Sequence, residues 1–259
     1  MGTLVMAEGG QFVPPGADSF VLPPIVGGIT KPMVLVAISA VLIAAYFVVS
    51  TRNLKVVPTK NQFAAEFLYG FSRDSIARDQ IGAKDFRPFV PLIFALFTFV
   101  LVNNIFGIVP FLQFPTMSKI GFPVALMLVV YVVFHGAGFR RHGFLGYFKH
   151  VMFPPGVPKA IYVILAPIEF LQKFVAQPLA LAIRVFAAMF AGHLMLLVFI
   201  LGGEYLLLEA SAGFKPISIV AFAFAIALTF VEALIQVLQA YIFALLTANF
   251  IGAALSEGH

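Results

Sequence analysis

Two long apolar stretches in the second half of the chain decide its fold. The first, AIYVILAPIEFLQKFVAQPLALAIRVFAAMFAGHLMLLVFILGG, covers residues 160–203, and the second, PISIVAFAFAIALTFVEALIQVLQAYIFALLTANFIGAALS, covers residues 216–256. A straight helix over either stretch would measure about 60 Å, twice a hydrocarbon core of about 30 Å. Neither stretch has a polar turn at its middle that would divide it into two upright spans. We therefore expect two strongly tilted or bent antiparallel helices, joined by a loop around residues 202–216.

The composition excludes a water-soluble protein. Of the 259 residues, 61% are hydrophobic and 10% are charged, whereas soluble domains carry about 45–50% apolar and 25% charged residues. The chain has no cysteine, its five histidines never fall in a metal-binding spacing, and it contains no phosphate loop, dinucleotide fingerprint or nucleophile elbow. We expect no metal, no cofactor and no nucleic-acid partner, and we attribute the net charge of +5 to the loops of a membrane protein.

The remaining sequence holds three further spans. Residues 32–51 form a charge-free run, residues 88–139 are long enough for two passes with a turn near residues 110–115, and the two long stretches bring the total to five. The fold class predicted is an all-α integral membrane protein. We divide the single membrane domain 1–259 into a Pro/Gly-rich lead (1–31), the first pass (32–51), a loop (52–87), two passes (88–139), a second loop (140–159) and the tilted hairpin (160–256).

Lysine and arginine predict the orientation. Residues 52–87 hold seven of them and residues 140–159 hold four, whereas the opposite side has Lys31, Lys119 and Lys215. The positive-inside bias places the two basic loops and the C-terminus in the cytoplasm, and the N-terminal lead outside. The lead has no basic start, which argues against a cleaved signal peptide.

The first basic loop contains an amphipathic pattern. One helical side of NQFAAEFLYGFSRDSIARD gathers Phe63, Ala64, Phe67, Leu68 and Phe71. This pattern predicts a helix lying on the cytoplasmic membrane interface. A small extramembrane helix packed on its own loops is the alternative.

The long stretches also hold most of the ionisable groups that the membrane would bury: Glu169, Lys173, Arg184, His193 and Glu232. Each charge at mid-membrane costs about 2.5–3.5 kcal/mol, so such residues are candidates for function. Glu169 and Lys173 are four apart and can pair along one helix. Arg184 has no charged neighbour within a turn and cannot lose its proton, so it needs a partner or a water-filled cavity.

In the last stretch Glu232, Gln236 and Gln239 share one helical face, which indicates a wetted pathway. A structural ion pair between Arg184 and Glu232 remains an alternative. In antiparallel helices it would require a different register from an Arg184–Gln239 and His193–Glu232 pairing, and the loop tolerates both.

The segments PLALAIRVFAAMFAGHLM (178–195) and EALIQVLQAYIFALLTANFI (232–251) resemble subunit a of the F-type ATP synthase, the stator half of its proton channel. The resemblance runs from about residue 58 to 255 and includes VNNIFGIVP in the second pass. It implies a non-catalytic subunit that moves protons through two offset half-channels in a bacterial plasma membrane. The implied partners are a ring of c subunits, b-type peripheral stalk subunits, the rest of the complex and membrane lipid.

The resemblance also assigns roles by position. Arg184 matches the essential arginine that faces the c-ring carboxylate, and Gln239 matches its glutamine neighbour. His193 and Glu232 match an acid–histidine pair, Asn104 a polar residue of the outer channel, and Glu169 an acid near the cytoplasmic one. The chain departs from its relatives at two positions: they commonly have Asn where this chain has Ala188, and some carry an acid where it has Gly107. The inner path must then be lined by other groups or by water.

Two rivals belong to other classes. A self-contained secondary transporter or channel would show internal repeats with broken half-helices, and the sequence has no such repeat. A membrane enzyme would have to combine His142, His150 and His193, but two of these fall in a loop and one in the bilayer.

Overall fold

The computed structural model describes residues 12–110, 112–153, 158 and 161–256, and within them five helical segments are long and apolar enough to cross a membrane. This confirms the predicted fold class. The spans are α1 (Lys31–Thr51), η3–α4 (Arg87–Phe89 and Val90–Ile105), α5 (Gly121–His142), α7–η6–α8 (Tyr162–Leu171, Gln172–Ala176 and Gln177–Leu208) and α9 (Lys215–Leu255).

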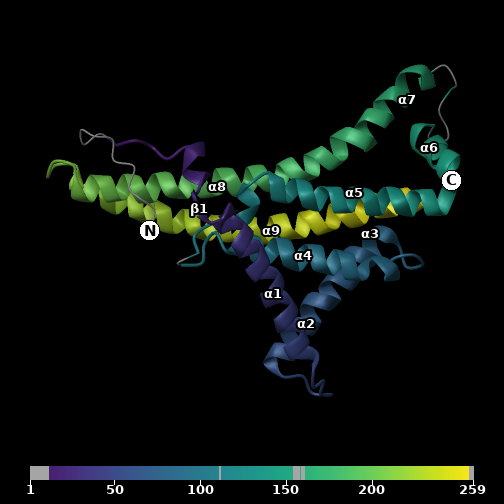
Figure 1. The fold of residues 1–259 in the computed structure, drawn as a ribbon, viewed down its shortest axis with the longest axis horizontal. Helices are drawn as coiled ribbons and strands as arrows, with labels where there is room; N and C mark the ends of the chain where they lie inside the picture. The colour runs from purple at the N-terminus through teal and green to yellow at the C-terminus, as the bar shows by residue number, and fades with distance from the viewer. Residues whose placement is uncertain (1–11, 111, 154–157, 159–160, 257–259) are drawn as a thin grey trace.

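The two longest helices, α8 and α9, form an antiparallel hairpin along the length of the molecule (Figure 1). A short turn joins them, closed by the Phe214 amide donating to the Ser211 carbonyl at 2.9 Å. Small residues allow close approach near this turn, since a Cβ on Gly203 would lie 3.2 Å from the Phe222 ring. Helices α4 and α5 pack beside α9, and their buried side chains form the main hydrophobic core with those of the hairpin.

The fourth span is bent. Pro167 lies inside α7, and a π-helical segment (η6, Gln172–Ala176) follows before α8 begins. Proline removes one backbone hydrogen bond and a π turn widens the helix, and both are common causes of kinks. Figure 1 shows α7 diverging from the hairpin as a result. The helical span also continues to Leu208, beyond the apolar stretch that the sequence defines.

Shorter helices fill the two basic loops. The first loop contains α2 (Lys60–Gly70), a π-helical segment η2 (Phe71–Arg78) and α3 (Asp79–Ile81), and the second contains α6 (Phe144–Met152). Phe63 and Phe67 on α2 are 61% and 62% exposed and stack on one another. Such an aromatic face suits the predicted contact with a membrane interface. Near the end of α9, Gly252 packs so closely against the backbone of Gln80 that an added Cβ would overlap the Gln80 carbonyl oxygen.

The N-terminal lead adds a small strand pair, which the all-α prediction did not include. Strand β1 (Pro24–Val26) pairs antiparallel with β2 (Ile29–Thr30), immediately before α1. Gly27 and Gly28 form the turn at φ of +53° and +90°, which glycine adopts without strain. Ahead of it, a single 3-10 turn (η1, Ala17–Phe20) lies against α8 through the buried Phe20 ring. A short 3-10 turn η4 (Thr116–Ser118) connects α4 to α5.

A buried acid–histidine cluster beside an exposed arginine

Three helices bring four polar side chains together in the apolar interior. His193 comes from α8, Glu232 and Gln236 come from α9, and Asn104 comes from α4. His193 and Glu232 are each 4% exposed, and Gln236 and Asn104 are fully buried. Buried polar groups at this depth are costly unless they are paired, so their convergence makes this cluster the candidate functional site.

A chain of contacts links the members of this polar cluster. His193 Nδ1 lies 3.7 Å from Glu232 Oε1, which is an ion-pair distance but too long for a hydrogen bond. The side-chain nitrogen Nε2 of Gln236 donates to the same Glu232 oxygen at 3.2 Å. The Asn104 amide nitrogen donates to the Gln236 backbone carbonyl, also at 3.2 Å. The cluster therefore connects α4 to the hairpin.

Several polar atoms in and beside the polar cluster lack a hydrogen-bond partner within the described residues. They are Asn104 Oδ1, His193 Nδ1, Glu232 Oε2, Gln236 Oε1 and, one turn further along α9, Gln239 Oε1. Leaving a buried polar atom unsatisfied costs about 1–3 kcal/mol. Polar groups left without a partner in this way are the kind that ordered water commonly satisfies in buried sites.

Gly107 lies at the edge of the polar cluster. A Cβ at this position would lie 3.1 Å from the Gln236 amide nitrogen and 3.0 Å from Pro115 Cβ. The Gln236 side chain therefore occupies the space that a side chain at residue 107 would need. This packing accounts for glycine at a position where the resemblance allows an acid.

Arg184 differs from the polar cluster because it is exposed. On α8 the adjacent Ala182 and Val185 are buried, while Ile183, Arg184 and Ala187 point outward. The structure gives Arg184 no hydrogen bond or ion pair with any described residue. It thus stands as a charge on the outer, apolar face of the hairpin.

The register of the hairpin excludes the alternative pair between Arg184 and Glu232. Glu232 approaches His193 and the neighbouring Gly192, whose added Cβ would lie 3.8 Å from Glu232 Cγ. In antiparallel helices this places Arg184 opposite Ala240 or Tyr241, within a turn of the half-buried Gln239. Nine residues separate Arg184 from His193, so the exposed charge lies about 13 Å from the polar cluster along α8.

Glu169 is not part of the polar cluster. It is half-buried on α7, and the structure, which describes both residues, shows no ion pair between Glu169 and Lys173, so the suggested pair along the helix is not formed. The physical reason is the π-helical segment η6, which includes Lys173 and changes the spacing at which side chains share a face.

A second polar network, made of uncharged side chains, was not predicted from the sequence. The Asn103 amide donates to Ser39 Oγ on α1 and to the Phe99 carbonyl, both at 2.8 Å, and Thr116 Oγ1 donates to Asn103 Oδ1 at 2.7 Å. Asn103, Ser39 and Thr116 are all fully buried. The Asn103–Asn104 pair in an apolar span is the signal that could have indicated it.

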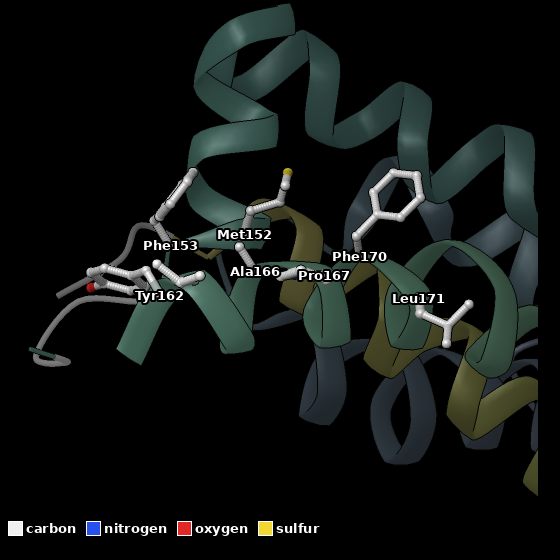
Figure 2. A pocket seen from close by; sticks show the side chains of 8 residues that line it. Met152, Phe153, Tyr162, Ala166, Pro167, Phe170 and Leu171 are labelled. Carbon is white, nitrogen blue, oxygen red and sulfur yellow. The ribbon is translucent and has the colours of Figure 1, made fainter. Parts of the chain in front are cut away.

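Other features lie away from the polar cluster. The Tyr147 hydroxyl is 2.9 Å from His135 Nδ1 on α5, and this buried contact joins α6 to α5. An open apolar pocket of about 690 Å³ lies between the end of α6 and α7. Figure 2 shows its wall of apolar side chains, among them Phe153, Pro167 and Phe170, and none of the cluster residues lines it.

Among the described residues, five candidate spans, a buried acid–histidine pair and an exposed arginine on the fourth of these spans are the features of a multi-pass membrane protein of ion transport. The chain belongs to the ATP synthase A chain family, whose sequence profile matches residues 33–252. Relatives named ATP synthase subunit a cover nearly the whole chain. The protein of Nocardioides sp. (strain ATCC BAA-499 / JS614) is 43% identical over 98% of this chain and 96% of its own length. The relative from Pseudarthrobacter chlorophenolicus is 45% identical over 96% of this chain and 95% of its own, and that of Streptomyces lividans 37% identical over 97% and 91%.

Proposed function

We propose that this membrane-sector component of ATP synthase is the stator of its proton motor. It offers two offset half-channels to the carboxylates of a rotating ring of c subunits. The observation that carries this proposal is the pairing of two features on one hairpin. A buried, incompletely satisfied His193–Glu232 pair lies about two and a half turns from Arg184, which is exposed and unpaired among the described residues.

The proton route follows the polar groups. Protons enter from the extracytoplasmic side past Asn104 to His193 and Glu232, whose polar atoms form the connected part of the path. Gln236 and the half-buried Gln239 continue along α9 toward the level of Arg184. Protons leave to the cytoplasm near Glu169 after the ring has turned. This direction rests on the excess of lysine and arginine in the loops 52–87 and 140–159.

Arg184 has an electrostatic role in this mechanism. A permanent cation favours the ionised form of a nearby acid, so a ring carboxylate that reaches Arg184 gives up its proton. The same charge raises the barrier to a proton that would cross directly between the half-channels. The membrane potential supplies about 2.3 kcal/mol per charge per 100 mV, which drives the ring in one direction.

The remaining parts of the machine belong to partners. The chain has no nucleotide-binding motif, so ATP chemistry is assigned to other subunits, and this subunit is non-catalytic. Besides the c-ring, we propose contacts with b-type peripheral stalk subunits and lipid in a bacterial plasma membrane. The N-terminus is assigned to the outside and the C-terminus to the cytoplasm.

A charge-removal experiment tests the proposal. In inverted membrane vesicles, Arg184→Ala is expected to abolish ATP-driven proton pumping, while ATP hydrolysis by the detached catalytic sector persists. Arg73→Ala is the matched control, because Arg73 is also exposed but lies in the loop helix and pairs with Asp74, at 3.8 Å. Coupled pumping at the parent level in assembled Arg184→Ala complexes would overturn the proposal.

A further inference from the structure

The N-terminal lead contacts α8 at two separate levels. Near one end of α8, the Phe12 ring lies 5.5 Å from the Tyr205 ring, and a Cβ added at Gly202 would lie 3.7 Å from Phe12 Cζ. Further along, the Phe20 ring lies 4.6 Å from Phe190 and 5.9 Å from the His193 imidazole. Residues 12–20, which we call the strap, therefore run antiparallel along α8, as Figure 1 shows for the purple segment beside it.

Phe20 is the one strap residue whose side chain is buried. It is 3% exposed, while Val21 next to it is 69% exposed. The η1 turn holds Phe20 in place through the Gly16 amide donating to Ser19 Oγ at 3.2 Å and the Val21 amide donating to the Asp18 carbonyl at 2.9 Å. The local backbone thus points a single aromatic ring at α8.

The Phe20 ring covers one side of the polar cluster. It meets the His193 imidazole at an interplanar angle of 69°, in an edge arrangement. Around it, Leu35, Phe106 and Phe114 form a small apolar cluster with Phe20 itself, and Leu194, the neighbour of His193, packs against that cluster. Water needs two to four polar partners to occupy a buried position, and this wall offers none.

We propose that the Phe20 ring forms a seal, blocking the access of water and protons to the His193–Glu232 pair from the side that the strap covers. Solvent and protons then reach the pair past Asn104, which supplies polar atoms, and not past the strap. The meaning of the seal for proton transport rests on the proposed function above, whereas the seal itself is a property of the packing. Phe20 is a positioning residue in this account, since it confines the approach to His193 without taking a proton.

Cysteine accessibility tests the seal directly, because the chain has no native cysteine. Leu194→Cys places a thiol beneath the strap, and Ala212→Cys in the exposed hairpin turn serves as the accessible reference. The assembled complex in open membrane sheets, where both faces meet the reagent, is labelled with a charged, membrane-impermeant methanethiosulfonate. The labelling rate is followed by the mass shift of this subunit.

When Phe20→Ala is added to the Leu194→Cys variant, the thiol at position 194 is expected to react at least about tenfold faster. Losing a buried aromatic ring removes more than the ~1.4 kcal/mol that a tenfold change corresponds to. Val21→Ala is the matched control and should leave the rate unchanged, and Phe20→Leu, which restores an apolar side chain, should return it close to the value with Phe20 intact. The reference thiol at position 212 should react equally in every background.

A labelling rate at position 194 that changes by less than about twofold on Phe20→Ala would overturn the seal, since a change that small is under 0.5 kcal/mol. The same holds if Val21→Ala and Phe20→Ala increase the rate equally, because a general loosening of the strap would then explain both. Failure of the proposed function is recognised separately, by parent-level proton pumping in His193→Ala complexes.

Discussion

Adjacent residues in α4 serve different purposes. Both polar atoms of the Asn103 side chain have hydrogen-bond partners: its nitrogen donates to Ser39 and Phe99, and its oxygen accepts from Thr116. These bonds hold α1 and the α4–α5 connection together. Asn104 makes one hydrogen bond, to the Gln236 carbonyl, and its own oxygen has no partner among the described residues. Full satisfaction indicates a structural role for Asn103, whereas the spare acceptor of Asn104 beside the His–Glu pair agrees with the proton path proposed above.

The two asparagines should therefore respond differently to alanine. Asn103→Ala leaves the buried Ser39 and Thr116 hydroxyls without this partner, at about 1–3 kcal/mol each, and should lower the unfolding temperature of the detergent-solubilised subunit. Asn104→Ala should leave the unfolding temperature nearly unchanged and slow proton pumping. Equal thermal losses in both variants would contradict this division.

The His193–Glu232 pair allows a charge-exchange prediction. Because the two side chains face each other at 3.7 Å, exchanging them keeps an acid and an imidazole at the same place. The double variant His193→Glu, Glu232→His should pump protons faster than either His193→Ala or Glu232→Ala. Vesicle pumping assays at equal complex content give the comparison, and an exchange as inactive as the single variants would show that the pair does not act as a unit.

Two glycines of α5 differ in how closely another helix packs against them. On α5, a Cβ at Gly138 would overlap the ring of Tyr147 on α6, whereas a Cβ at Gly136 would meet nothing within 4 Å. Tyr147 is 1% exposed and holds α6 against α5 through His135. Gly138 thus permits the second basic loop to fold back on its own span.

Alanine at these two positions distinguishes the effect of packing on stability from the effect of helix propensity. Gly138→Ala should destabilise the α5–α6 contact by about 1–3 kcal/mol through overpacking. Gly136→Ala is the matched control in the same helix and should be neutral or stabilising by about 0.4–1 kcal/mol. Thermal unfolding of the purified subunit measures both, and a loss of stability in Gly136→Ala equal to that in Gly138→Ala would contradict the overlap.

At the scale of the whole molecule, the sequence predicted the number of spans because each depends only on apolar length. It also indicated the long antiparallel hairpin, since no polar turn interrupts residues 160–203 or 216–256. The π-helical segment after α7 was beyond prediction, because its cause is a local change of hydrogen bonding and not a residue type. The small β1–β2 pair was missed for a related reason, since two short strands leave no periodic signal.

The sequence named the members of the polar cluster as candidates, and the structure adds how they are arranged. An isolated ionisable residue in an apolar run is visible in the sequence. Arg184, His193 and Glu232 therefore stand out, because placing an ionisable side chain in the membrane costs free energy. The register that separates Arg184 from Glu232 was left open, because the loop near residue 212 accommodates both pairings. Only the packing of Gly192 and His193 against Glu232 selects one of them.

An experimental structure of the assembled membrane sector gives the most direct measurement of the central claim. The quantity is the distance from the Arg184 guanidinium to the nearest carboxylate. We predict that this carboxylate belongs to a ring subunit, lies within about 4–6 Å, the range over which a cation lowers the pKa of an acid, and faces the exposed side of α8. A guanidinium that instead pairs with Glu232 or Glu169 of its own chain, with the ring against another face, would contradict the account.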